Sequence, residues 1–192
     1  MPKVPEVFFK PSECVNDPCG AITVPATAPS ALDAEVELAI IIGKDCKNVD
    51  DATALDYILG YTVANDVTAR DIQARVSQWG FSKGYDGFCP LGPVIVRADA
   101  PEFDVKNLRM TTTLNGETLQ DGNSSEMIFS VESIVSYLSQ DTTLAAGTVI
   151  ITGTPSGIGH SYKPPKYLGL GDDLKVSIGC GLGTLVNPIV AA

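Results

Sequence analysis

The sequence has no long hydrophobic run, and this argues against a helix that crosses a membrane. Such a helix needs about 20 consecutive apolar residues, whereas the apolar runs here are as short as Leu38 to Ile42 and Val149 to Ile151. The opening residues MPKVPEVFFKP also lack the apolar core and the small-residue cleavage site of a signal peptide. We therefore expect a cytoplasmic protein without a membrane partner, and leave a mitochondrial location open.

Concentrated positive charge is missing as well. The 13 Lys and Arg residues are outnumbered by 23 Asp and Glu residues, the net charge is −10, and no window gathers basic side chains. Binding to phosphate backbones or anionic lipids depends on such clusters. The composition therefore excludes nucleic acid as the expected partner.

Paired cysteine motifs are absent too. The five cysteines form an odd set without CxxC spacing, which disfavours both a disulfide scaffold and a zinc finger. Free thiols in a reducing compartment are expected instead. They are Cys14, Cys19, Cys46, Cys89 and Cys180.

The length of 192 residues, 44% of them hydrophobic, predicts one domain. Residues 1–30 contain Pro2, Pro5, Pro11, Pro18 and Pro25 and show neither a helical nor a strand period, which is typical of extended and turning backbone. We predict an N-terminal arm over residues 1–30 and a catalytic domain over residues 31–192.

Strand patterns dominate the remainder, so we predict a mainly β fold with short helices, of the α+β class and rich in antiparallel pairs. Asn115-Gly116 between alternating arms is the strongest hairpin signal. Helices are predicted from Asp51 to Leu59 after an Asp50 cap, from about Thr68, and over residues 131–139 after Ser130. The predicted strands are residues 35–42, 61–66, 94–96, 148–152, 172–178 and 184–190.

Two carboxylates stand one residue apart at the start of the most apolar strand. Residues i and i+2 of a strand point to the same face, so Glu35 and Glu37 converge and would repel each other without a positive partner. A solvated strand face that pairs with lysines is one explanation. A hard divalent cation is the other, and Asp66 in VANDVTARD is a candidate third oxygen ligand.

Several motifs in sequence order resemble the C-terminal catalytic domain of the fumarylacetoacetate hydrolase family. They cover nearly the whole chain and are specific as a set. The motifs are FFKPS (8–12), EVELAIIIGK (35–44), GYTVANDVTARDIQ (60–73), SKGYDGFCPLGP (82–93), LNGETLQ (114–120), GTVIITGTPSGIG (147–159) and LGLGD (168–172).

The resemblance implies a mixed β-sandwich roll, usually a homodimer, with Mg²⁺ or Mn²⁺ bound by Glu35, Glu37 and Asp66. It also implies a substrate side lined by Arg70, Gln73, Lys83 and Thr154, with Lys83 and Arg70 in catalytic roles. Taken alone, Arg70 and Gln73 are one helical turn apart and can face one cavity. A structural ion pair of Arg70 with Asp71 or another acid, and a solvent-exposed Lys83, are the plainer alternatives.

Members of this family act on 2-oxo and 1,3-dicarbonyl acids such as acylpyruvates, fumarylpyruvate and oxaloacetate. A metal that chelates the 2-oxo acid serves C–C hydrolysis, decarboxylation or tautomerisation through the same Lewis-acid effect. The resemblance therefore implies a metal-dependent enzyme with a small oxo-acid substrate.

One departure from the family pattern affects this expectation. Family hydrolases carry a His and a Glu in a lid segment just before the FxKP motif, and here only seven residues precede Phe8 and no histidine precedes His160. General-base activation of water contributes roughly 10² to 10⁴ in rate, so we expect hydrolysis to suffer more than the other outcomes. A metal-binding pseudoenzyme or small-acid-binding homologue is the alternative. A serine hydrolase centred on Ser156 is disfavoured, because GTPSG lacks the Gly-x-Ser-x-Gly elbow.

Overall fold

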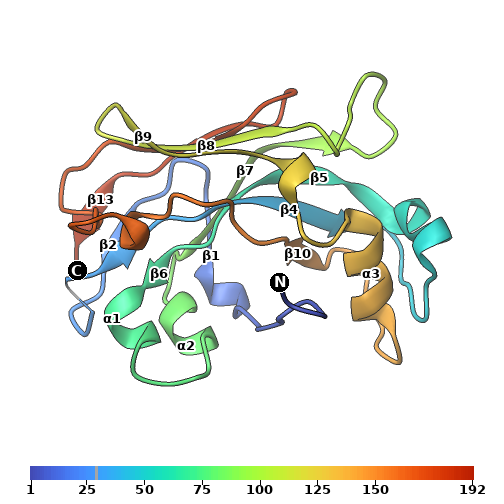
Figure 1. Ribbon diagram of the computed structural model, residues 1–192, viewed down its shortest axis with the longest axis horizontal. Coiled ribbons are helices and arrows are strands. Elements are labelled where there is room, and N and C mark those ends of the chain that lie inside the picture. The colour runs from blue at the N-terminus through green and yellow to red at the C-terminus, as the bar shows by residue number, and fades with distance from the viewer. Residues whose placement is uncertain (29) are drawn as a thin grey trace.

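Two β-sheets pack against each other in the computed structural model, which describes residues 1–28 and 30–192, and short helices lie at their edges (Figure 1). The strands are β1 (Val15–Asn16), β2 (Ile22–Val24), β3 (Leu32–Asp33), β4 (Val36–Ile42), β5 (Ile58–Asn65), β6 (Thr68–Ala69), β7 (Cys89–Arg97), β8 (Arg109–Leu114), β9 (Glu117–Asn123), β10 (Val149–Ile151), β11 (Leu174–Ile178), β12 (Gly183–Val186) and β13 (Ile189–Ala191). The helices are α1 (Arg70–Gln73), α2 (Gly80–Lys83) and α3 (Val131–Ser139), with 3₁₀ turns η1 (Ser12–Cys14), η2 (Asp51–Tyr57), η3 (Ser124–Glu126) and η4 (Gly159–Ser161).

The first sheet has the strand order β1-β7-β5-β4-β10 and carries the apolar run of β4 in its middle. Every residue of β4 is buried, as expected of a strand with both faces covered. The antiparallel pairing of β4 with β5 sets Val36 opposite Asn65 and Glu37 opposite Ala64. This register brings the residues around Glu35 next to those around Asp66.

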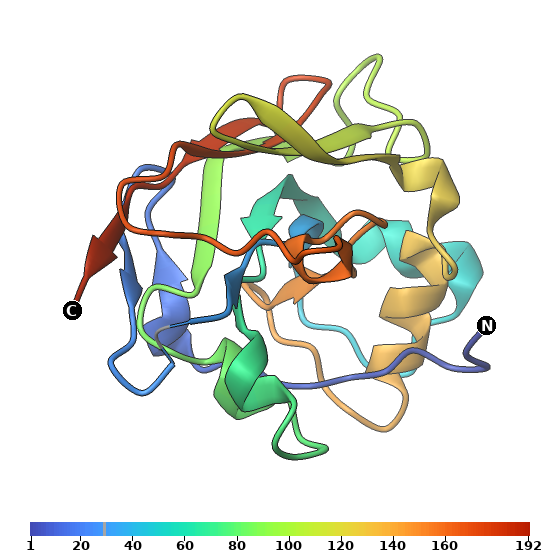
Figure 2. The same cartoon turned by 60° about the vertical axis from the view of Figure 1, so that its left-hand side comes forward.

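The second sheet has the order β12-β11-β8-β9 and lies over the first; β11 contacts β4 and β5, β8 contacts β4, and β12 contacts β5. The predicted hairpin at Asn115-Gly116 is confirmed, since β8 and β9 pair across it. Both turn residues have positive φ angles, 52° and 80°, which is the backbone conformation of a type I′ turn. Turning the molecule by 60° shows the strands curling around the core (Figure 2).

The mainly β fold class is confirmed, and one predicted helix is confirmed closely. Helix α3 covers residues 131–139, and the Ser130 side chain accepts the Ser133 N–H at 3.2 Å as its N-cap. Its buried positions Val131, Ile134 and Val135 form the stripe that faces the core.

Two other helix predictions are right only in part. Residues 51–57 form the 3₁₀ turn η2 with only Ala54 buried, and Leu59 belongs to β5 and is half exposed. The pairing of Ile58 with Ile42 draws the end of the predicted helix into the sheet. Thr68 begins β6 rather than a helix, because it pairs with Asp33, and α1 follows as a single turn.

The N-terminal residues are built into the fold at several points. Strand β1 pairs in parallel with β7 and β2 with β13, and Cys14 and Ile22 belong to the hydrophobic core. The predicted division between an arm (1–30) and a catalytic domain (31–192) stays a prediction, and Pro29 lies outside the described residues.

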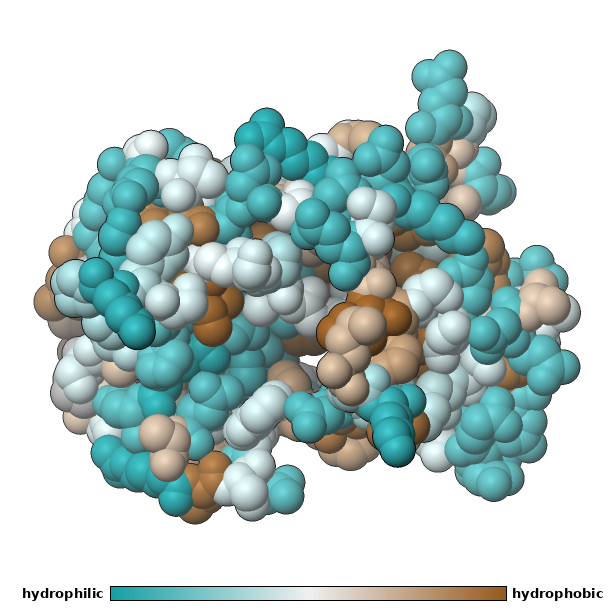
Figure 3. Space-filling model, in the orientation of Figure 1, coloured by the Kyte–Doolittle hydropathy of each residue, from teal (hydrophilic) through white to brown (hydrophobic). Residues whose placement is uncertain are grey.

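The surface seen in Figure 3 is mainly polar, and the cysteines form no disulfide in the described residues. Seen in the orientation of Figure 1, the surface is mainly hydrophilic with scattered hydrophobic groups (Figure 3). All five cysteines are free, and Cys14, Cys46 and Cys89 are buried. No helix in the described part of the chain is long and apolar enough to span a bilayer.

Candidate metal centre

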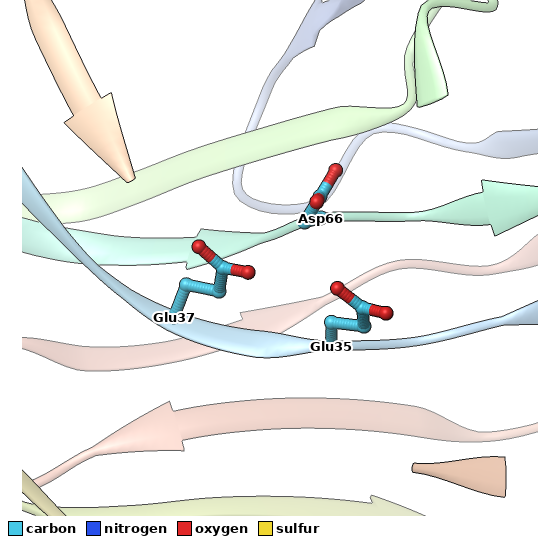
Figure 4. A group of neighbouring side chains, drawn as sticks. All are labelled: Glu35, Glu37 and Asp66. Carbon is cyan, nitrogen blue, oxygen red and sulfur yellow. The ribbon is translucent and has the colours of Figure 1, made fainter. Parts of the chain in front are cut away.

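Three carboxylates converge where β4 begins and β5 ends. The main-chain N–H of Asp66 donates to the carbonyl of Glu35 at 2.9 Å, so the two residues are neighbours across the strand pair. Glu37 lies two residues along the same face. One oxygen from each of Glu35, Glu37 and Asp66 lies within 4.8 Å of the others, and all three side chains are buried (Figure 4).

Burial excludes the simpler explanation of the Glu-x-Glu pair as a solvated strand face. The exposed fractions are 6% for Glu35, 4% for Glu37 and 0% for Asp66. Buried carboxylates need partners or a cation to offset their lost hydration. The hydrogen-bond and ion-pair partners of the three carboxylates therefore show whether their charges are already balanced or leave room for a cation.

Lys83 is the first partner. Its ammonium group donates to Glu35 Oε2 at 3.0 Å, to Asp66 Oδ2 at 2.6 Å and to Thr68 Oγ1 at 2.8 Å. The residue is 2% exposed, so the solvent-exposed alternative for this lysine is wrong. Burial by itself would lower the pKa of Lys83, but the Asp66 and Glu35 carboxylates raise it on balance, so the group stays positively charged.

Lys10 is a second, partly buried ammonium that the sequence analysis did not single out. It donates to Asp66 Oδ1 at 2.6 Å and to the carbonyls of Lys83 and Phe88 at 2.5 and 3.1 Å. Its position in the motif FFKPS was the available signal. Asp66 is thus held by one lysine on each oxygen.

Arg70 supplies the third positive charge from the start of α1. Its Nη2 donates to Glu35 Oε1 at 2.5 Å, its Nε to Asp33 Oδ2 at 2.9 Å and its Nη1 to Gln73 Oε1 at 3.0 Å. The predicted proximity of Arg70 and Gln73 is therefore present. The salt-bridge alternative is present as well, with Glu35 and Asp33 rather than Asp71 as partners.

Glu37 differs from the other two carboxylates. Within residues 1–28 and 30–192, no Lys or Arg forms an ion pair with it; its Oε2 accepts the Gly153 N–H at 2.7 Å. Burial, followed by the nearby charges of Asp66 and Glu35, raises the pKa of Glu37 well above its ordinary value. Negative charge at this position is thus under-compensated.

The donor set fits a hard divalent cation. It consists of carboxylate oxygens only, which Mg²⁺ and Mn²⁺ prefer. Each carboxylate oxygen carries two lone pairs, so an oxygen that accepts a lysine or arginine N–H retains one for a metal. The four buried carboxylates of the cluster outnumber its three cations, of which Arg70 and Lys83 are buried and Lys10 is partly buried; the carboxylates are those of Asp33, Glu35, Glu37 and Asp66.

Thr154 lies beside the cluster in the loop after β10. Its hydroxyl donates to the Val36 carbonyl at 2.9 Å and accepts Nε2–H of Gln120 at 2.8 Å. Because its only proton is committed to Val36, the hydroxyl can offer a further ligand an acceptor but not a donor. Gln120 is completely buried, and its Oε1 also accepts the Val36 N–H; its position at the end of the motif LNGETLQ was the available signal.

His160 lies away from the three carboxylates. Its imidazole Nδ1 bonds the hydroxyl of Tyr167 at 2.7 Å on the exposed surface. Only its main-chain N–H is directed inward, toward Asp33 at 3.0 Å. The imidazole of His160 is therefore directed to the surface and not toward the carboxylate cluster.

The raised pKa of Glu37 predicts that the metal-free protein becomes less stable as pH rises. The folded state retains a proton that an unfolded Glu releases near pH 4.3, so stability is lost from that value up to the raised pKa. Urea unfolding midpoints of the wild type and Glu37→Gln, measured in EDTA from about pH 5 to about pH 8, should converge at low pH and diverge at high pH. Parallel curves would contradict the prediction.

Comparisons with known proteins agree on one family. The family model described as fumarylacetoacetate (FAA) hydrolase C-terminal matches residues 1–190. The chain is 44% identical to the Dictyostelium discoideum fumarylacetoacetate hydrolase domain-containing protein 2 homolog over 98% of its own length and 65% of that protein's length. It is 40% identical to the oxaloacetate tautomerase YisK of Bacillus subtilis, over 98% of this chain and 62% of that one.

A solved structure shows the same architecture. The fumarylacetoacetate hydrolase of Exiguobacterium antarcticum superposes with a TM-score of 0.92 at 44% identity, covering 96% of this chain and 66% of that one. The chain thus spans less than two thirds of the length of the two curated relatives.

Proposed function

This chain belongs to the fumarylacetoacetate hydrolase family, and on that premise we propose that it is a divalent-metal-dependent enzyme acting on a small 2-oxo dicarboxylic acid. The reaction we favour is tautomerisation of oxaloacetate, the activity named for a relative that is 40% identical. The observation that carries the proposal is the buried group of Glu35, Glu37 and Asp66 with its three adjacent cations. Mg²⁺ and Mn²⁺ are the proposed cofactors.

A cation bound by the three carboxylates would supply Lewis-acid polarisation of the 2-oxo acid. Lys83 adds a fixed positive charge at the same point, because its pKa is raised and its ammonium is buried. A charge fixed before the reaction stabilises negative charge that develops on a substrate oxygen without reorganisation. This is the catalytic role that we assign to Lys83.

The hydrogen bonds of Lys83 indicate where a substrate oxygen would enter. Two of its three N–H groups face the carboxylates of Glu35 and Asp66, and the third faces the neutral hydroxyl of Thr68. All three bonds are charge-assisted because the ammonium donates them, but only those to Glu35 and Asp66 add the attraction of an opposite charge in a buried site. The bond to Thr68 is therefore the one most readily exchanged for a bond to substrate.

Arg70 follows the same rule. Its Nε and Nη2 face Asp33 and Glu35, while Nη1 faces the neutral amide of Gln73. A substrate carboxylate that displaces Gln73 Oε1 would gain Nη1 of Arg70 and could accept from the amide of Gln73. Arg70 and Gln73 are our proposed carboxylate site, with Thr154 as a substrate-side acceptor.

C–C hydrolysis of an acylpyruvate or fumarylpyruvate is the second candidate. It is favoured by the 44% identity to the structure named as a fumarylacetoacetate hydrolase. Both reactions place negative charge on the 2-oxo oxygen, so the same cations would serve either one. They differ in the need for an activated water molecule.

The purified protein should convert the enol of oxaloacetate to the ketone in the presence of Mg²⁺ or Mn²⁺. Enol absorbance, CO₂ and pyruvate are followed separately, so that tautomerisation, decarboxylation and hydrolysis of acetylpyruvate and fumarylpyruvate are distinguished. We expect the enol absorbance to fall without a matching release of CO₂. EDTA should abolish this fall in absorbance. Full activity in EDTA would refute the metal role, and metal binding without turnover of any of these acids would favour the pseudoenzyme alternative.

The homodimer and the cytoplasmic location remain predictions. Exposed apolar side chains on β7, Val94 at 49% and Ile95 at 51%, offer a surface that a second copy could cover. A dimer would have twice the chain mass of 20.2 kDa.

A further inference from the structure

We infer that Asp33 is a positioning residue that fixes Arg70 and the loop of residues 153–160 to each other across the proposed metal site. The inference rests on the proposed function for its consequence but on geometry for its existence. Asp33 lies in the short strand β3, is 2% exposed and was not identified in the sequence analysis.

The carboxylate of Asp33 accepts hydrogen bonds on both oxygens from two separate segments. Oδ2 accepts from Arg70 Nε at 2.9 Å and from the His160 N–H at 3.0 Å, and Oδ1 accepts from the Gly159 N–H at 2.9 Å. The Ala34 N–H also donates to Oδ1 at 3.0 Å. All the lone-pair directions of this carboxylate are thus used.

The glycine at position 159 is required for this contact. A Cβ at Gly159 would lie 2.0 Å from the Lys166 carbonyl and 2.7 Å from Asp33 Oδ1. Only a residue without a side chain brings its N–H so close to the buried carboxylate. This gives the last glycine of GTPSGIG a physical role, to let the loop dock on Asp33.

The loop fixed in this way contributes to the other side of the site. Gly153 donates its N–H to Glu37 Oε2, and Thr154 bonds Val36 and Gln120. Gln120 therefore anchors the beginning of the loop, and Asp33 anchors its end. Through Arg70 the same carboxylate sets the position of Glu35 Oε1.

Asp33 also divides the charge of Arg70 between two carboxylates. Because Asp33 and Glu35 share the guanidinium of Arg70, Arg70 offsets only part of the charge of Glu35, which remains available to a cation. The substitution Asp33→Asn would turn one oxygen into an N–H donor that faces other donors, either Arg70 and His160 or Ala34 and Gly159. Arg70 would then neutralise Glu35 alone, and we expect a weaker metal site.

The first test examines the hydrogen bonds of Asp33 in the metal-free protein. Amide exchange followed by NMR should show the Gly159 and His160 N–H groups and the Arg70 Nε–H protected in the folded wild type, and roughly tenfold or more faster in Asp33→Asn. Asp121→Asn is the matched control, because Asp121 forms the same type of ion pair with Arg109 on the surface. Rapid exchange of these groups in the folded wild type would overturn the inference, even if Asp33→Asn failed to fold.

The second test measures coupling through Arg70. The Kd for Mn²⁺ is determined by titration for the wild type, Asp33→Asn, Arg70→Met and the double variant. Changes behind metal ligands typically cost about 10–100-fold, and we expect a loss of that size for Asp33→Asn but less than about threefold once Arg70 is replaced by Met. Equal losses in both backgrounds would show a general structural role and overturn the coupling.

The two tests separate this inference from the proposed function. A wild type that binds Mn²⁺ with the expected coupling but turns over no oxo acid would refute the enzyme proposal alone. A wild type that binds no Mn²⁺ would refute the metal site and the coupling together. Protected Gly159 and His160 amides would still support the role of Asp33 in fixing the loop of residues 153–160.

Discussion

Glu37→Gln is expected to abolish binding of the divalent cation while leaving the metal-free protein at least as stable as the wild type. The substitution would remove one of the three carboxylates that we propose as metal ligands. Changes behind a metal ligand already cost about 10–100-fold in affinity, so loss of the ligand itself should exceed roughly 100-fold. Isothermal titration with Mn²⁺ measures the affinity, and the oxaloacetate assay should show a parallel loss of activity.

The stability half of this prediction follows from the surroundings of Glu37. Its ionised form is opposed by burial and by the charges of Asp66 and Glu35, and in the described part of the chain its side chain has the Gly153 N–H as its single hydrogen-bond partner. A neutral amide of the same shape removes that repulsion without leaving a lysine or arginine unpaired. Glu117→Gln, at an exposed carboxylate paired with Lys166, is the matched control. A large drop in stability with unchanged Mn²⁺ affinity would contradict the assignment.

Asp66→Asn is expected to remove metal binding and to destabilise the fold at the same time. Asp66 is completely buried and is the shared partner of Lys10 and Lys83. Removing one partner of a buried ion pair costs about 3–5 kcal/mol because the other charge stays buried. In a protein of this size that corresponds to a fall in Tm on the order of 10 °C.

The contrast between the two variants distinguishes a metal ligand from a purely structural carboxylate. Both should lose Mn²⁺, but only Asp66→Asn should lose stability in EDTA. Thermal unfolding of the metal-free proteins, with the surface variant Asp121→Asn as a reference, gives the comparison. If Asp66→Asn melted with the wild type, the two lysines would have other partners and the described cluster would be wrong.

The local sequence was sufficient where neighbouring residues decide the structure. The Asn115-Gly116 turn and the Ser130 cap define β8, β9 and α3 because these signals act within a few residues. It was insufficient at residues 51–59, where a helical stripe competes with pairing of Ile58 to Ile42 across the sheet. Tertiary pairing outweighs a weak helical propensity over so short a segment.

The residues of the candidate site could likewise be identified from the sequence only in part. The period of a strand places Glu35 and Glu37 on one face, and the family motifs indicate Asp66, Arg70, Gln73, Lys83 and Thr154. The partners of these residues could not be read from spacing. Lys10 reaches Asp66 across 56 positions, and Asp33 reaches Arg70 across 37.

By itself the sequence determined the acidic pair, the mainly β class and the family to which its motifs belong, because these depend on local periodicity and residue order. Only the tertiary structure decided that Glu37 has no positively charged partner among the described residues while Glu35 and Asp66 have two each. The reason is that the charge balance of a buried site depends on which distant segments the sheet brings within a few ångströms. Without hydration, an ion pair there is stronger and an unpaired charge is more costly than at the surface.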